Sequence, residues 1–216
     1  MAAAYLPAFA RQGIGGDFYD VFLTEAKQIG ILIGDVSGKG IEAAALAAAS
    51  RSTIRSFAYE MPCAGDSLAH TNAVLYTQHA TTGDFVTAFL AILDPTTGDI
   101  EYARAGHPPA AIRRANGSVE FLELGDPPIG VFDRQVFESG RSSLGPGDKI
   151  VLYTDGVVEA RRDSQLFDVD GVDRALAGHG HKSAPDVADE ILRAAQEWAR
   201  GDLRDDAAIL VIERIK

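Results

Sequence analysis

The sequence predicts an α+β fold in which mostly antiparallel sheets are covered by helices. Apolar segments of strand length follow one another in runs, and short turns rich in Gly, Pro, Asp and Thr separate them. Segments with helical periodicity come in pairs and do not alternate one by one with the strands. A doubly wound parallel sheet requires that alternation, so it is not expected.

The first half of the chain is expected to hold strands before and after a pair of helices. The segment "FVTAFLAIL" is apolar on both of its faces, which predicts a buried strand. "DPTTGD" follows it as a turn, so the next strand should return antiparallel to it. Asp66 is the expected N-cap of the second helix. The expected strands are 4–10, 17–23, 29–35, 85–93 and 100–106, and the expected helices are 41–59 and 65–79.

The second half is expected to continue with short strands, a further helix pair and a last strand. Ser183 or Ala184 lies near the cap of the last helix, and Pro185 fits its first turn because its fixed φ suits that position. The final segment "AAILVIERI" is apolar enough for a buried strand. The expected strands are 110–114, 118–122, 136–143, 149–154 and 207–215, and the expected helices are 170–178 and 185–200.

Composition and charge narrow the class of protein. The chain has 216 residues, 46% of them hydrophobic and 24% charged, which is ordinary for one globular domain. Its formal charge of −11 argues against a nucleic-acid partner and against an anionic membrane surface. No apolar run is long enough for membrane insertion. The single Cys63 excludes an internal disulfide framework and a Cys-rich zinc site, and it suits the cytoplasm.

The stretch "ILIGDVSGKGIEAAALAAAS" (31–50) raises the question of what Asp35 does at the end of an apolar strand. A Walker A loop does not fit, because the spacing differs and Gly40 stands where Ser or Thr binds Mg²⁺. A dinucleotide fingerprint fits Gly38, Gly40 and Ala43, but a helix follows where the second strand and its acidic residue belong. The third interpretation, a metal-binding aspartate, requires partners elsewhere in the chain.

Such partners exist, because an aspartate stands four times where an apolar strand meets a turn. A single aspartate of this kind is most simply a turn former or a helix cap. Four of them, if they converge, would repel one another and would need divalent cations. Oxygen ligands suit Mg²⁺ or Mn²⁺, and neighbouring glycines let backbone carbonyls and water approach a metal. The four places are Asp17 with Asp20, Asp35, Asp155 with Gly156, and Asp205 with Asp206.

Six motifs of the chain are, in order, "GGDFYD", "GDVSGKG", "AGHPP", "GDPPIG", "LYTDGVVEA" and "RDDAAILVI". Together they resemble the metal-dependent serine/threonine phosphatase superfamily (PPM), specifically its bacterial RsbU/SpoIIE branch. The resemblance implies a four-layer α-β-β-α sandwich with two mostly antiparallel sheets and flanking helix pairs. It also implies that 1–216 is a single phosphatase domain excised from a longer multidomain regulatory protein.

The resemblance assigns roles to the aspartates one by one. Asp35 would bridge two divalent cations, Mn²⁺ or Mg²⁺, and the carbonyl of Val36 would complete the shell of one of them. Asp155 and Asp205 would hold the second cation, and Asp17 would bind a metal-bound water or support the first. These metal ligands are also the expected catalytic residues, since a metal-activated water would attack the phosphorus.

Further residues are candidates for contacts to phosphate or for support of the metal ligands. Lys39 stands where many relatives have His, and it is either a phosphate contact or a solvated turn lysine. His107 is a candidate general acid, although an imidazole between a strand and two prolines more often pins a turn. Gly156 and Asp206 adjoin the expected ligands. Lys39 is thus one departure from the family pattern, and two further ones are Ala208, where a hydroxyl residue is usual, and Arg104, where Asn is common.

The function implied is hydrolysis of phosphoserine or phosphothreonine on a regulatory protein. The implied substrate is a phosphorylated anti-sigma-factor antagonist of the STAS type, in a stress-response pathway. A regulatory sensor domain in the same longer chain is the other implied partner, and a homodimer is left open. The alternative is a degenerate phosphatase fold that senses or binds without turnover, which the departures at Lys39 and Ala208 keep open.

Overall fold

The computed structural model describes residues 2–6, 16–61, 63–79, 83–177, 183–201 and 203–215. The chain forms two compact units, each with a five-stranded sheet and its own helices. The first unit contains residues 1–13, 108–122 and 144–216, and the second contains 14–107 and 123–143. Helices together with two antiparallel sheets make the α+β fold that the sequence predicts.

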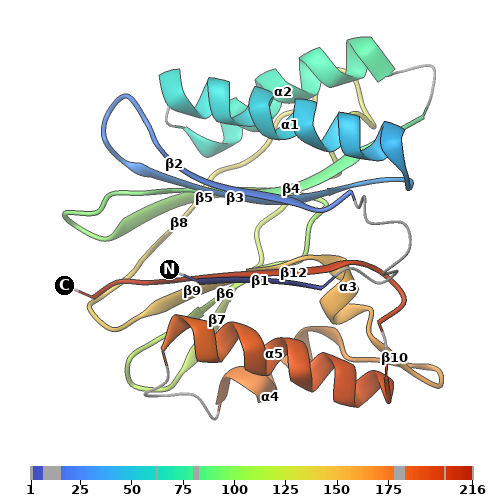
Figure 1. Ribbon diagram of the computed structural model, residues 1–216. Coiled ribbons are helices and arrows are strands. Elements are labelled where there is room, and N and C mark those ends of the chain that lie inside the picture. Colours follow the sequence, from blue (N-terminus) through green and yellow to red (C-terminus); the bar gives the residue numbers. More distant parts are fainter. Residues whose placement is uncertain are drawn as a thin grey trace. The chain divides into compact units, whose positions relative to one another are not determined.

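The second unit has an antiparallel five-stranded sheet in the order β2-β3-β4-β5-β8. Helices α1 and α2 cover one face of this sheet (Figure 1). Their pairing matches the helix pair expected from the sequence, to within one residue at each end. The elements are β2 (Phe18–Leu23), β3 (Ile29–Val36), α1 (Ile41–Glu60), α2 (Ala64–His79), β4 (Val86–Leu93), β5 (Asp99–Ala105) and β8 (Gly140–Ser143).

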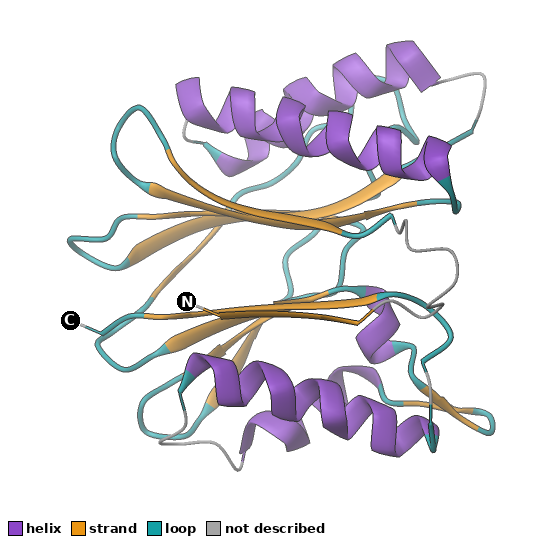
Figure 2. Ribbon diagram, viewed as in Figure 1, coloured by secondary structure: helices purple, strands orange, loops and turns teal. Residues whose placement is uncertain are grey.

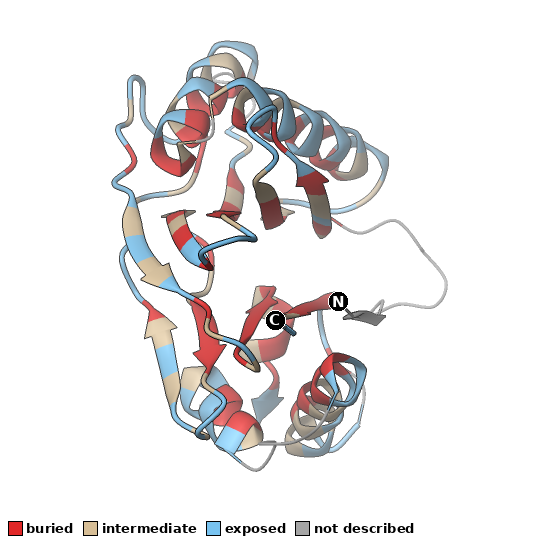
Figure 3. Ribbon diagram, turned by 90° about the vertical axis from the view of Figure 1, so that its left-hand side faces the viewer, coloured by how far each residue is buried: buried red, intermediate tan, exposed pale blue. Residues whose placement is uncertain are grey.

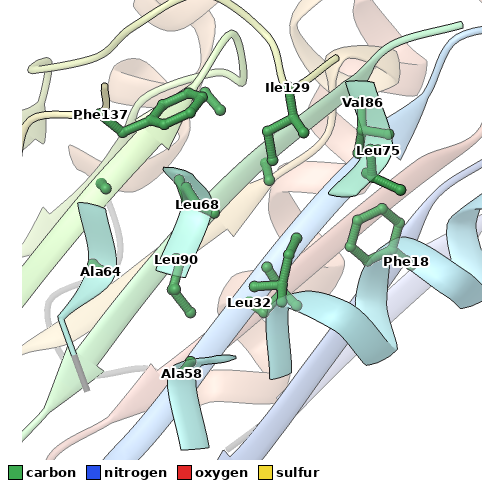
Figure 4. Packing of buried hydrophobic residues seen from close by; sticks show 14 of the residues in the cluster. Phe18, Leu32, Ala58, Ala64, Leu68, Leu75, Val86, Leu90, Ile129 and Phe137 are labelled. Atoms are coloured by element: carbon green, nitrogen blue, oxygen red, sulfur yellow. The ribbon is translucent and has the colours of Figure 1, made fainter. Parts of the chain in front are cut away.

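The core of this unit lies between its sheet and its helix pair. In Figure 4, Leu32 and Leu90 on neighbouring strands lie beside Leu68 of α2. All three side chains are fully buried. The opposite face of β4 is also buried, for example at Phe89, as expected for a segment that is apolar on both faces. Two central strands are thus held firmly, and β3 carries Asp35 at its end.

The first unit has an antiparallel sheet in the order β1-β12-β9-β6-β7. Figure 2 shows the strands of this sheet in orange and the helices that cover it in purple. Helix α5 packs on β12 and β1, α4 packs on α5, and the short α3 packs on β12. A two-stranded hairpin, β10-β11, stands beside α5. The elements are β1 (Ala2–Leu6), β6 (Ala110–Arg113), β7 (Val119–Leu122), β9 (Lys149–Tyr153), α3 (Asp155–Val158), β10 (Arg161–Arg162), β11 (Gln165–Leu166), α4 (Asp168–Ala177), α5 (Ala184–Ala199) and β12 (Ala207–Glu213).

Helix α5 shows how this unit is built from its sequence. Ser183 is its N-cap in a capping box with Asp186, and Pro185 lies in the first turn, as predicted. Its buried residues recur every three to four positions, among them Val187 and Ile191, so one side faces the sheet. Figure 3 shows the same division along the long helices, with buried residues on one side and exposed residues on the other.

The structure departs from the predicted elements in a few places. Helix α2 starts at Ala64, so Asp66 lies in its first turn and the predicted N-cap is wrong. The amide of Ala64 donates instead to Glu101 Oε1 at 3.1 Å, and the amide of Gly65 donates to Ser139 Oγ at 3.0 Å. The predicted strand 136–143 is shortened to β8, and residues 7–10 of the first predicted strand lie outside the described residues. The short α3, β10 and β11 were not predicted.

Across the described parts of the chain, no helix is both long enough and apolar enough to span a lipid bilayer.

Candidate metal centre

In the second unit, the end of β3 brings two oxygen donors to one place. Asp35 pairs with Thr87 of β4 and is half-buried, while Val36 is buried. A Cβ added to Gly16 would lie 2.7 Å from Asp35 Oδ1 and 2.7 Å from the Val36 carbonyl oxygen. Both oxygens therefore converge on one position beside Gly16, where any side chain would clash with them, so only glycine fits there. Asp17 follows directly and is half-buried.

His107 is almost completely buried, with 1% of its surface exposed. Its Nδ1 is 3.0 Å from Thr87 Oγ1, and the Thr87 hydroxyl donates to the carbonyl oxygen of Asp35 at 3.4 Å. This order of donors places the ring proton on Nδ1. The burial and the contact favour the turn-pinning interpretation over a general acid, with the imidazole supporting the Asp35 backbone through Thr87.

Arg104, one of the departures from the family pattern, holds the loop around His107. Its guanidinium donates to three backbone carbonyls, those of His107 at 2.8 Å, Leu124 at 3.3 Å and Glu123. A Cβ on Gly125 would lie 2.6 Å from the Arg104 Cζ, so the loop passes close over this group. The arginine thus ties the "AGHPP" turn to the "GDPPIG" loop.

Arg104→Ala is expected to lower the free energy of unfolding by about 2 kcal/mol, because three hydrogen bonds from a charged donor would be lost, one of them to the part-buried His107 carbonyl. Urea unfolding of the variant and the parent measures this difference. Arg51→Ala, at an exposed position of α1, is the matched control and should change stability by less than about 0.5 kcal/mol. Equal losses in both variants would contradict the role assigned to Arg104.

In the first unit, the start of α3 rests on the entry to β12. Asp155 is the first residue of α3, directly after the N-cap Thr154. The Thr154 amide donates to the Ala208 carbonyl at 3.0 Å, and the Ala208 amide donates to Thr154 Oγ1 at 2.9 Å. This reciprocal pair fixes the α3 start against β12, and here the hydroxyl comes from Thr154 while residue 208 is Ala.

Gly156 marks the closest approach between these two segments. A Cβ at this position would lie 1.8 Å from the Asp206 carbonyl oxygen and 3.3 Å from the Asp205 carbonyl oxygen. Asp205 is exposed, Asp206 is half-buried, and the Asp206 amide donates to Asp205 Oδ1 at 3.0 Å. Within this unit, the structure therefore brings the backbones of the "TDG" and "RDD" motifs close together.

Like charges gather around Asp155. Burial raises the pKa of its carboxyl group, and the nearby carboxylates of Glu159 and Asp205 raise it further. Sequence reasoning missed Glu159, although its spacing of four residues from Asp155 puts both on one side of a helical turn. A cavity of about 260 Å³ adjoins this cluster and is lined by Gly156, Glu159, Arg161, Arg204 and Asp205.

The shift at Asp155 predicts how metal-free protein responds to pH. Because the folded pKa lies above the ordinary carboxyl value, stability falls as pH rises through that interval. Asp155→Asn removes the penalty, so in EDTA at pH 7 its Tm should exceed that of the parent. The gain should vanish below pH ~3.5, where both side chains are neutral. Scanning calorimetry at both pH values measures the difference, and a lower Tm for the variant at pH 7 would contradict this account.

Lys39 lies in the turn between β3 and α1. It is exposed and stands between Gly38 and Gly40, whose φ angles of 102° and 91° favour glycine. Asp17, Asp35, Val36, Lys39 and His107 all belong to the second unit, and Asp155, Gly156, Asp205 and Asp206 to the first.

The donor set fits hard divalent cations. Within the described parts of the chain, no three His, Cys, Asp or Glu side chains form a group that could hold a metal ion. The nearest features are the Asp35 and Val36 oxygens beside Gly16 and the crowded carboxylates around Asp155. Carboxylates with a backbone carbonyl are the ligands that Mg²⁺ and Mn²⁺ prefer, and a cation would offset the repulsion at Asp155.

Comparison with known proteins finds similarity along nearly the whole chain. The family model described as Stage II sporulation protein E (SpoIIE) matches residues 25–215. Protein IcfG of Synechocystis sp. is 30% identical over 191 residues, which cover 76% of this chain and 30% of IcfG. Phosphoserine phosphatase RsbP of Bacillus subtilis is 26% identical over 211 residues, 96% of this chain and 51% of RsbP. The chain thus spans about half or less of these two relatives.

Solved structures show the same fold. The RsbU and RsbW domains of Rv1364c from Mycobacterium tuberculosis match with a TM-score of 0.78 and 26% identity, over 98% of this chain and 60% of that one. The PP2C phosphatase domain of SpoIIE from Bacillus subtilis, solved with a fragment of its regulatory domain, matches with a TM-score of 0.82 and 20% identity. That match covers 98% of this chain and 62% of the SpoIIE chain.

Proposed function

Because the chain belongs to the SpoIIE family of PP2C-type phosphatase domains, we propose that it hydrolyses phosphoserine or phosphothreonine on a regulatory protein. The observation that carries the proposal is the pair of oxygens, Asp35 Oδ1 and the Val36 carbonyl, that converge on one position beside Gly16. A turn-forming aspartate does not need a second oxygen donor beside it. Metal-dependent phosphatase chemistry needs oxygen donors that face a shared space.

Two divalent cations, Mn²⁺ or Mg²⁺, are the proposed cofactors. When bound, they supply an acidified water and offset the charge of the phosphoryl oxygens. Asp35, Asp17 and the Val36 carbonyl of the second unit and Asp155 and Asp205 of the first would supply the oxygen ligands to these cations. His107 would hold the Asp35 backbone through Thr87, and Lys39 is a candidate contact to phosphate from its exposed turn.

The proposed substrate is a phosphorylated anti-sigma-factor antagonist of the STAS type. The name of RsbP, a phosphoserine phosphatase, supports a phosphoserine substrate, and the linkage of RsbU and RsbW domains in the Mycobacterium tuberculosis protein supports partner switching. The chain would act in the cytoplasm as one domain of a longer regulatory protein, with a sensor domain attached.

Hydrolysis of p-nitrophenyl phosphate tests the enzyme proposal against a binding module without turnover. Activity should appear with Mn²⁺ or Mg²⁺, disappear in EDTA and return when the metal is restored. A phosphoserine peptide should be dephosphorylated under the same conditions, with inorganic phosphate as the product. No metal-dependent turnover on either substrate, from protein with a cooperative thermal transition, would favour the binding module.

A further inference from the structure

Trp198 of α5 contacts the β10-β11 hairpin and the residue that follows it. The guanidinium of Arg162 lies 5.7 Å from the centre of the Trp198 ring, a cation–π distance. The indole Nε1 donates to the Gln165 carbonyl at 3.5 Å, and Phe167 packs edge-on with a centroid distance of 6.2 Å. Both strands of the hairpin are therefore anchored to the same side chain, and the hairpin has a fixed support.

Arg161 faces the other way, because successive side chains of a strand point to opposite faces. It lines the 260 Å³ cavity together with Arg204, Gly156, Glu159 and Asp205. Arg161 and Arg204 are both exposed, and neither forms an ion pair with another residue that the structure describes. Two guanidinium groups thus converge on one cavity without a carboxylate bound to either.

We propose that Arg161 and Arg204 form an oxyanion subsite for the phosphoprotein substrate. Guanidinium groups recognise phosphate and carboxylate oxygens through pairs of hydrogen bonds, and the cavity is of a size to admit such a group. The oxyanion is either the phosphoryl group itself or an acidic side chain next to the phosphoserine. This inference rests on the proposed function, since it gives a role to residues beside the candidate metal ligands Asp155 and Asp205.

The net charge around the cavity would favour an anion when a cation is bound at Asp155 and Asp205. Without metal, Arg161 and Arg204 line the cavity together with Glu159 and Asp205, so two positive and two negative side chains balance. A divalent cation on Asp155 and Asp205 would offset the carboxylates and leave the two guanidinium groups in excess. An anion would then be attracted, and its binding should depend on bound metal.

The test compares Arg161→Ala and Arg204→Ala with Arg174→Ala. Arg174 lies 5.9 Å from the centre of the same Trp198 ring but does not line the cavity, so it controls for loss of an arginine on this face. KM and kcat are measured in Mn²⁺ for p-nitrophenyl phosphate and for two phosphoserine peptides, one with acidic flanks and one with alanine flanks. Arg161→Lys tests whether a positive charge without the guanidinium group is enough to keep KM near the parent value.

The subsite predicts that KM rises at least about tenfold in Arg161→Ala, with little change in Arg174→Ala. A rise with all three substrates identifies the phosphoryl group as the ligand, and a rise confined to the acidic peptide identifies a flanking carboxylate. Unchanged KM values for every substrate in both Arg161→Ala and Arg204→Ala would overturn the subsite while leaving the phosphatase proposal intact.

A second readout does not depend on turnover. In Mg²⁺, inorganic phosphate should raise the Tm of the parent by mass action, and the rise should be smaller in Arg161→Ala than in Arg174→Ala. If the parent has no phosphatase activity, the proposed function fails, and this thermal shift still tests the subsite by itself. Equal shifts in the parent, Arg161→Ala and Arg204→Ala would overturn a phosphate-binding subsite.

Discussion

Asp35→Asn is expected to lower Mn²⁺-dependent turnover of p-nitrophenyl phosphate roughly a thousandfold or more, which corresponds to about 4 kcal/mol of transition-state stabilisation. Asn has nearly the same shape as Asp and fits a strand end equally well, so the change removes charge without disturbing the backbone. Since the nucleophile would depend on the bridging carboxylate, turnover should fall while the metal-free Tm stays near that of the parent. Steady-state kinetics and calorimetry measure both quantities.

Asp94→Asn provides the matched control at the opposite end of β4. Asp94 accepts hydrogen bonds from the amides of Thr96 at 2.7 Å and Thr97 at 3.2 Å, so it is a turn-forming aspartate. Its substitution should leave kcat and KM unchanged. If Asp35→Asn behaves like Asp94→Asn, then Asp35 is also a turn former and the metal interpretation fails.

Gly156→Ala should have the second-largest effect, through the backbone that supports Asp155 and Asp205. The new methyl group would lie 1.8 Å from the Asp206 carbonyl oxygen, and a main-chain atom cannot move aside as a flexible side chain can. The start of α3 and the entry to β12 would have to separate. We expect a loss of about 1–3 kcal/mol in stability and a fall of about a hundredfold in kcat, because the candidate ligands would be displaced.

Gly145→Ala is the control for this substitution in the same unit. Its added Cβ would lie 3.5 Å from Asp148 Oδ2, an ordinary contact, and its φ is not in the left-handed region. Urea unfolding and p-nitrophenyl phosphate kinetics on both variants separate a local clash from a general intolerance of alanine. A Gly156→Ala protein with the stability and activity of the Gly145→Ala protein would contradict the close approach of α3 and β12.

Most of the fold could be predicted because its elements are long and strongly patterned. The helices α1, α2 and α5 and the strands β3, β4 and β12 appear within two residues of their predicted bounds. The elements that were missed have only two to four residues, too short for any periodicity to appear. The wrong N-cap at Asp66 has a tertiary cause, because Glu101 and Ser139, distant in sequence, bind the first amides of α2.

The candidate site was predictable to the extent that its residues stand in local motifs. Asp35 and Asp155 could be identified as candidates because each places a carboxylate at the end of an apolar strand. The roles of Gly16 and Thr87 depend on packing and hydrogen bonds that no local pattern reveals. The same holds for Arg161, because only the contact of its neighbour Arg162 with Trp198 indicates which arginine faces the cavity.

The central claim is that Asp35 is a metal ligand. Calorimetric titration of Mn²⁺ into the metal-free parent and into Asp35→Asn tests this claim most directly. The parent is expected to bind two Mn²⁺ ions, and Asp35→Asn should lose at least one of them or bind far more weakly. The same stoichiometry and affinity in both proteins would show that Asp35 is not a metal ligand, and would remove the metal centre from this account.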